Sequence, residues 1–145
     1  MLDIFVETGT YHGHTAKRMS RYFTKVFTIE KSNVMFHIAK HNLKDINNCM
    51  VLQGDSREHL NTLLNDNDNI LFWLDAHWSG GDTYGQNDEC PLLDELQIIL
   101  CYKKNYLIMV DDARLFLAPP PFPTTIEIGH QLMTFAMFYQ QTNKL

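Results

Sequence analysis

Five short apolar runs alternate with segments of helical periodicity along most of the chain, and no other feature constrains the fold as strongly. We expect strands at residues 3–7, 25–30, 49–53, 69–75 and 105–110, with helices between them. Such alternation predicts an α/β protein with a parallel sheet. Because crossovers between parallel strands are nearly always right-handed, we expect a doubly wound, mainly parallel sheet with strand order 3-2-1-4-5.

The helices have recognisable start signals. The first is expected at residues 14–22, and the second is capped by Ser32 and carries Val34, Ile38 and His41 on one face. The third follows Asp55. The fourth begins at Pro91 and has two acids in its first turn, where the helix dipole favours negative charge.

The length and composition of the chain limit the number of domains that it can form, and its charge limits the partners that it can bind. With 145 residues, 45% hydrophobic and 20% charged, the chain predicts one domain over residues 1–145. The net charge is −5, and the basic residues are scattered apart from the pairs Lys17-Arg18 and Lys103-Lys104. This balance argues against a general nucleic-acid binder, although it leaves room for a local basic patch.

The three cysteines lie in no C-x-x-C pair, which disfavours a disulfide framework or a zinc knuckle and favours a reducing compartment. No apolar run is long enough to span a bilayer, and no signal-peptide pattern opens the chain. We therefore expect a cytoplasmic protein with no membrane partner.

A glycine-bearing loop follows the first strand. The apolar run at residues 4–6 leads into Gly9 and Gly13, and a helical pattern comes next. Glycine tolerates positive φ and lets a ligand approach the backbone, so a loop of this kind between a strand and a helix predicts a site for a nucleotide-like group. The third glycine of a dinucleotide-binding loop is missing.

Acidic residues end several of the expected strands, and the ends of parallel strands meet at the ligand-binding edge of such a sheet. Glu30 lies 21 residues after Gly9, near the spacing of an acid that accepts hydrogen bonds from ribose hydroxyls. The alternative is that Glu30 pairs with Lys31 or faces water. Asp55, with Ser56, could accept the amino group of an adenine, cap a helix, or do both.

These segments together resemble the class I S-adenosylmethionine-dependent methyltransferases, which have a Rossmann-like fold. The resemblance spans residues 4–116 and is carried by residues 7–13, 28–30 and 54–56. It implies that the glycine loop lies behind the methionine part of the cofactor and that Glu7 lies near its sulfonium or amino group. The expected cofactor-binding residues are Glu7, Gly9, Tyr11, Gly13, Glu30, Asp55, Ser56 and Asp75.

Two later segments, residues 73–82 and 108–114, resemble the metal-dependent O-methyltransferases of the macrocin type. This resemblance implies a divalent cation such as Mg²⁺ bound by Asp75, Asp111 and Asp112. Such an ion would lower the pKa of a substrate hydroxyl, with Asp75 and His77 as the catalytic residues and His77 as proton acceptor. The alternative is that the three aspartates only cap loops.

The C-terminal segment departs from the methyltransferase pattern, which ends in two further strands. Only a short segment with four prolines follows Asp112, and residues 124–139 fit a helix or, from residue 132, a short strand. We therefore expect a sheet truncated at its C-terminal end. A second subunit could complete the open edge, which makes a homodimer one expectation and a fragment another.

The function expected from this resemblance is methyl transfer to a hydroxyl of a small molecule, such as a sugar or a natural-product-like acceptor. One alternative is a methyltransferase-like domain that binds a ligand or partner without turnover. Another is an NAD(P)-dependent oxidoreductase, which the missing third glycine and the lack of a Tyr-x-x-x-Lys pair disfavour.

Overall fold

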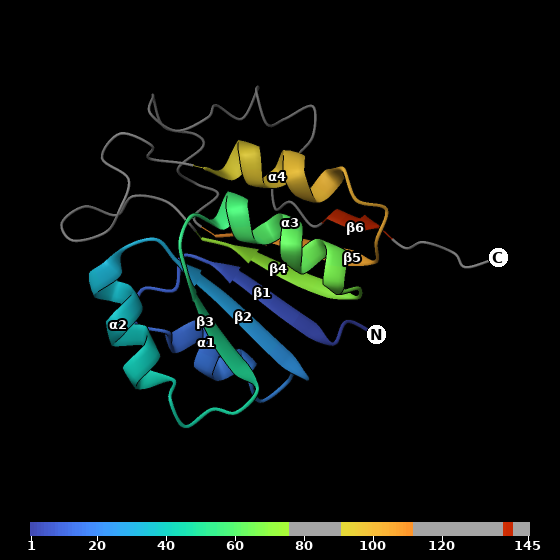
Figure 1. Ribbon diagram of the computed structural model, residues 1–145. Coiled ribbons are helices and arrows are strands. Elements are labelled where there is room, and N and C mark those ends of the chain that lie inside the picture. Colours follow the sequence, from blue (N-terminus) through green and yellow to red (C-terminus); the bar gives the residue numbers. More distant parts are fainter. Residues whose placement is uncertain (76–90, 112–137, 141–145) are drawn as a thin grey trace.

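The computed structural model describes residues 1–75 and 91–111 and, for the backbone alone, the strand at 138–140 (Figure 1). The strands are β1 (Ile4–Thr8), β2 (Lys25–Glu30), β3 (Cys49–Gln53), β4 (Ile70–Leu74), β5 (Tyr106–Val110) and β6 (Phe138–Gln140). The helices are α1 (His14–Met19), α2 (Asn33–Asn42), α3 (Ser56–Asp66) and α4 (Leu92–Leu100).

All six strands form one sheet, in the order β3-β2-β1-β4-β5-β6. The first five are parallel, so the predicted α/β fold and the order 3-2-1-4-5 are confirmed. β6 pairs antiparallel with β5, with Tyr106 opposite Gln140. The sequence allowed either a helix over residues 124–139 or a short strand from residue 132. The structure has a strand at residues 138–140, and residues 112–137 lie outside the described residues.

β1 lies at the centre of the sheet and sends alternate side chains to its two faces. Ile4 and Val6 join the larger apolar cluster, to which α3 and α4 contribute their buried leucines. Phe5 joins a second cluster with Ala16 of α1 and Leu43 on the opposite face. Figure 1 accordingly shows α3 and α4 over one face of the sheet and α1 behind it. Period-two alternation therefore gives the sheet two covered faces.

The buried face of α2 is not the face that carries Val34 and Ile38. Val34 and Ile38 do share a face, but this face is largely solvent-exposed, with exposed fractions of 57% and 36%. Met35, Phe36 and Ala39 are the buried residues of the helix. The spacing of apolar residues along α2 fits either face, so only contact with the rest of the protein selects the buried one.

No helix among the described residues is long and apolar enough to cross a bilayer.

Leu60 of α3 tests the larger apolar cluster. Its side chain is fully buried, so Leu60→Ala should lower the free energy of unfolding by about 2–5 kcal/mol through lost apolar burial and a residual cavity. Leu100→Ala, at a position with 38% exposure, should cost less than about 1 kcal/mol. Urea denaturation measures both values, and equal costs would contradict this assignment of the core.

Candidate functional site

The residues that follow three of the strands remain in register at one edge of the sheet. Gly9 N donates to the carbonyl oxygen of Ile29 at 3.0 Å, and Asp75 N donates to that of Thr8 at 3.0 Å. Asp111 N donates to the carbonyl oxygen of Leu74, also at 3.0 Å. These bonds extend the parallel ladders by one residue, so Gly9, Asp75 and Asp111 come side by side at the carboxyl ends of the strands.

The loop after β1 has the conformation that its glycines predict. Gly9 and Gly13 have φ values of 83° and 81°, in the region that residues with a Cβ atom rarely adopt. A Cβ atom on Gly13 would lie 2.8 Å from Leu43 Cδ1. Tyr11 between them also has a positive φ, 49°. The loop therefore holds an unusual conformation at the start of α1.

Glu30, at the end of β2, fastens this loop to the next one. One carboxylate oxygen accepts a hydrogen bond from Tyr11 N and the other from Ser32 N, each at 2.8 Å. Glu30 is only 8% exposed, so it does not simply face water. A carboxylate has about four acceptor positions, so both oxygens retain capacity for ligand hydroxyls. Ribose binding by Glu30 stays a prediction, and the loop contact was not foreseen.

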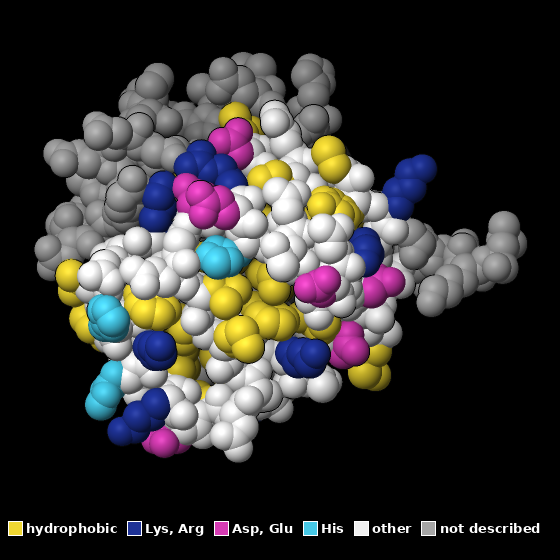
Figure 2. Space-filling view, in the orientation of Figure 1, with side chains coloured by type: hydrophobic (Ala, Val, Ile, Leu, Met, Phe, Trp, Pro, Cys, Tyr) yellow, Lys and Arg dark blue, Asp and Glu magenta, His cyan; other side chains and the backbone are white. Residues whose placement is uncertain are grey.

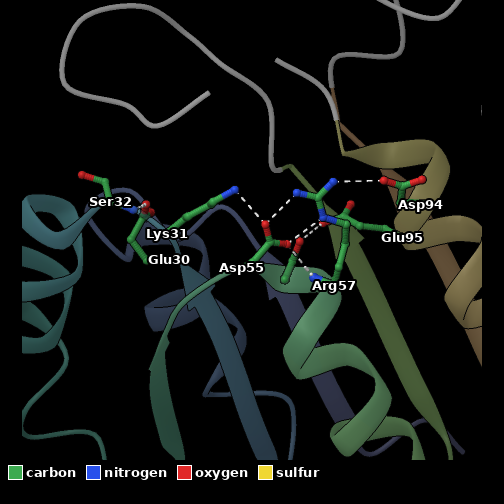
Figure 3. A network of polar contacts seen from close by, with 8 residues as sticks. Glu30, Lys31, Ser32, Asp55, Arg57, Asp94 and Glu95 are labelled. Carbon is green, nitrogen blue, oxygen red and sulfur yellow. Dashed lines mark hydrogen bonds and ion pairs between the residues drawn. The ribbon is translucent and has the colours of Figure 1, made fainter. Parts of the chain in front are cut away.

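Asp55 caps α3, which confirms one of the two roles predicted for this residue. Oδ1 accepts from the backbone N and Nε of Arg57, and Oδ2 accepts from Lys31 Nζ and from Arg57 Nη2, both at 2.7 Å. The hydrogen bonds from Arg57 and then from Lys31 hold the pKa of Asp55 well below its usual range. Arg57 also reaches Asp94 of α4 at 3.0 Å (Figure 3). Contact with an adenine stays a prediction.

Glu7 is a buried acid on the α1 face of β1, with 1% exposure. Its carboxyl accepts a hydrogen bond from Thr28 Oγ1 at 2.5 Å, and this hydroxyl also shares a hydrogen bond with Thr10 Oγ1. Burial, with smaller contributions from the charges of Asp75 and Glu30, raises the pKa of Glu7 to about 8. Three predicted site acids are therefore close enough to interact electrostatically.

A third buried acid, Glu95, was not among the predicted site residues. It lies in the first turn of α4 with 1% exposure. Its carboxylate accepts hydrogen bonds from Ser56 Oγ at 2.5 Å and Thr8 Oγ1 at 3.4 Å, and it thereby joins α4 to α3 and β1. Burial raises its pKa to about 7. Its position after Pro91 signals a helix start, but nothing local in the sequence signals that it is buried.

The predicted metal ligands are brought together only in part. Asp75 and Asp111 follow β4 and β5 directly, and these strands pair in parallel with Leu74 beside Val110. Asp112 and His77 lie outside the described residues. Within residues 1–75 and 91–111, no group of three potential ligands is close enough to bind a metal. Two neighbouring carboxylates fit the donor chemistry of Mg²⁺, and the complete ligand set stays a prediction.

No protein-family model and no curated protein matches the chain, but solved structures do. An S-adenosylhomocysteine-bound methyltransferase of Podospora anserina superimposes with a TM-score of 0.61 and 19% identity; the match covers 83% of this chain and 52% of that one. A Bacillus cereus O-methyltransferase in complex with S-adenosylhomocysteine has a TM-score of 0.55 and 20% identity, with coverage of 79% and 50%. An rRNA methylase of Streptococcus thermophilus has a TM-score of 0.54 and 18% identity, with coverage of 99% and 80%.

The chain has the class I methyltransferase fold. It spans about half the length of the first two of these structures. At identities below 25%, the likeness establishes the architecture alone. The predicted Rossmann-like fold is confirmed.

Glu95 predicts a specific pH dependence of stability. Its pKa is raised in the folded protein from 4.5 to about 7, so its stabilising contribution is fully present below pH 4.5 and is lost as the pH rises to 7. Glu95→Gln removes the charge, keeps one acceptor oxygen for a hydroxyl, and places an NH2 group that can donate to the other hydroxyl. At pH 8 this variant should be more stable than the wild type by about 1–3 kcal/mol, measured by urea denaturation at pH 5, 6.5 and 8.

Ser56→Ala is the companion variant, because it leaves Glu95 ionisable but removes the hydrogen bond that lowers its pKa. It should move the loss of stability to higher pH. An unchanged pH profile in Glu95→Gln would show that Glu95 does not titrate in this range.

Proposed function

We propose that the chain is an S-adenosylmethionine-dependent methyltransferase domain whose cofactor lies over the glycine loop. One observation carries the proposal: the acids Glu7, Glu30 and Asp75 gather where β1, β2 and β4 end, beside a loop with two positive-φ glycines. S-adenosylmethionine carries a cationic sulfonium and an ammonium group. Both gain electrostatic stabilisation beside a concentration of carboxylates.

The same acids distinguish this cofactor from a dinucleotide. A pyrophosphate is anionic and binds where a loop presents free backbone N–H groups and no negatively charged side chain lies close by. In this loop the N–H of Tyr11 already donates to Glu30, and Glu7 and Asp75 lie close by. A pyrophosphate here would meet the negative charges of Glu30 and Asp75, and it would lie beside the buried carboxyl of Glu7, whose pKa is raised to about 8. This supports the methyltransferase over the oxidoreductase alternative.

The adenosyl part fits the remaining rim. Glu30 has acceptor capacity for the two ribose hydroxyls and already holds the loop and Ser32 in place. The adenine would then lie beside Asp55 and Ser56, at the start of α3. Both residues are held rigidly, Asp55 by Lys31 and Arg57 and Ser56 by Glu95. A fixed rim reduces the ordering cost of binding.

For the acceptor we propose a hydroxyl of a small molecule, on the resemblance of residues 73–82 and 108–114 to metal-dependent O-methyltransferases. Asp75, Asp111 and Asp112 would hold a divalent cation, which would lower the pKa of the acceptor hydroxyl. His77 would accept the proton. A domain that binds the cofactor without turnover remains the alternative, and it differs from this proposal by binding without product.

Calorimetric titration with S-adenosylhomocysteine tests the cofactor site. The wild type should bind saturably, and Glu30→Gln should bind at least about tenfold more weakly, because one backbone N–H and a ribose hydroxyl lose a charged acceptor. Glu58→Gln, at an exposed position of α3, is the control with the same charge change and should bind like the wild type. No binding by folded wild-type protein would contradict the proposal.

Asp111→Asn tests the metal site. Titration of Mg²⁺ into protein saturated with S-adenosylhomocysteine should show binding that this variant weakens about tenfold or more, since it loses a charged oxygen ligand. The exposed Asp66→Asn has the same chemistry at the far end of α3 and serves as control. Equal affinity for Mg²⁺ in both variants would remove Asp111 from the ligand set.

A further inference from the structure

The positive charge of the protein is concentrated in one stretch. Residues 11–44 contain seven of the twelve Lys and Arg residues and a single acid, Glu30, which gives this stretch a formal charge of +6 in a chain whose net charge is −5. Glu30 is buried. The surface formed by this stretch is therefore far more basic than the average of the chain.

On α1 and the turn that follows it, the basic residues form one stripe. His14, Lys17, Arg18 and Arg21 stand at positions i, i+3, i+4 and i+7, and all four are exposed. The turn bonds from Arg21 N and Tyr22 N continue the helical path beyond Met19. Residues at this spacing share one side of a helix.

α2 and its C-terminal end repeat the same spacing. His37, Lys40, His41 and Lys44 are exposed and again lie at i, i+3, i+4 and i+7. In Figure 2, Lys and His side chains gather over α2 at the lower left, with few acids among them. Two consecutive helices thus each present a basic stripe to solvent.

Contacts of the residues that flank the two helices bring α1 close to the C-terminal end of α2, on the same face of the sheet. Asn42 Nδ2 donates to the carbonyl oxygen of His12 at 3.1 Å, just before α1 begins. Leu43 packs in the same apolar cluster as Ala16 of α1. Asn48 Nδ2 donates to the carbonyl oxygens of Ser20 and Phe23 beyond its end. The chain after α2 therefore runs along α1. We call the eight residues of the two stripes the basic surface.

Exposed aromatic rings lie at both ends of the α1 stripe. The rings of Tyr11 and His12 stack with centroids 4.0 Å apart and an interplanar angle of 8°, and His12 meets His14 edge-on at 5.9 Å. Tyr11 is 51% exposed, and Tyr22, next to Arg21, is 74% exposed. Planar rings among cations are the combination that binds unpaired bases and their phosphates.

We propose that the basic surface binds a single-stranded nucleic acid, with phosphates on the Lys and Arg side chains and bases on Tyr11 and Tyr22. An anionic membrane fits less well, because an interfacial helix presents a broad face of large apolar side chains, whereas the exposed apolar residues of α2 are only Val34 and Ile38. The expectation of no nucleic-acid partner used the average charge, which conceals this local surface. The proposal does not depend on methyl transfer.

Fluorescence anisotropy with a labelled 12-nucleotide single-stranded RNA tests the proposal, and a DNA of the same sequence identifies the preferred sugar. The wild type should bind saturably at 50 mM salt. About five phosphate contacts predict a slope of log K against log salt of about −3.5. Lys17→Glu and Lys44→Glu should each weaken binding about fivefold and reduce the slope by about 1.

Lys103→Glu is the matched control, because Lys103 is exposed and outside the basic surface and the charge change is the same. It should change the affinity less than about twofold. Combining Lys17→Glu with Lys44→Glu should weaken binding about 25-fold if both helices hold the same strand. Melting temperatures of all variants establish that they are folded.

Tyr22→Ala tests base stacking and should weaken single-strand binding by about fivefold or more. Three results would overturn the proposal: no saturable binding to either strand at 50 mM salt, the same loss in Lys103→Glu as in Lys17→Glu, or equal binding of single-stranded and duplex RNA. Binding to vesicles of phosphatidylserine and phosphatidylcholine without RNA binding would show that the partner of the basic surface is an anionic membrane and not a nucleic acid.

Discussion

The carboxylate of Glu30 is the interaction on which the geometry of the site depends. It accepts one backbone hydrogen bond from the loop after β1 and one from the residue that caps α2. A loop with three positive-φ residues within five positions has little conformational preference of its own, so an external acceptor must hold it. The loop that this carboxylate fastens lies at the carboxyl ends of the strands, where the proposed cofactor would bind.

Two further carboxyls, Glu7 and Glu95, are buried on opposite faces of β1. Each is held by hydroxyl groups, Glu7 by Thr28 and Glu95 by Ser56 and Thr8. Each of these buried acids has a raised pKa and therefore lowers the stability of the folded protein at neutral pH. Packing of the core alone therefore does not explain why an acid stands at either position. A cationic ligand beside Glu7 would recover part of this cost, whereas Glu95 fixes the relative positions of α3, α4 and β1.

Local sequence pattern predicted the five parallel strands to within one residue, their order, the glycine loop and the acids at the rim, because these depend on periodicity, glycine conformation and crossover handedness. It did not predict the buried face of α2, where Val34 and Ile38 fit the helical spacing but lie outside the core. It also missed the burial of Glu95 and the closeness of α1 to the C-terminal end of α2. Those features arise from contacts between elements far apart in the sequence.

The most direct test of the cofactor site is an NMR titration of ¹⁵N-labelled protein with S-adenosylhomocysteine, followed through the backbone amides. The account predicts that the largest shifts occur at Gly9, Tyr11, Gly13 and Ser32, which surround Glu30 at the carboxyl ends of the strands. The amides of Thr24 and Asn105, at the other ends of the strands, should remain unchanged. Shifts confined to those two residues, or no shifts at saturating ligand, would contradict a cofactor site built on the glycine loop.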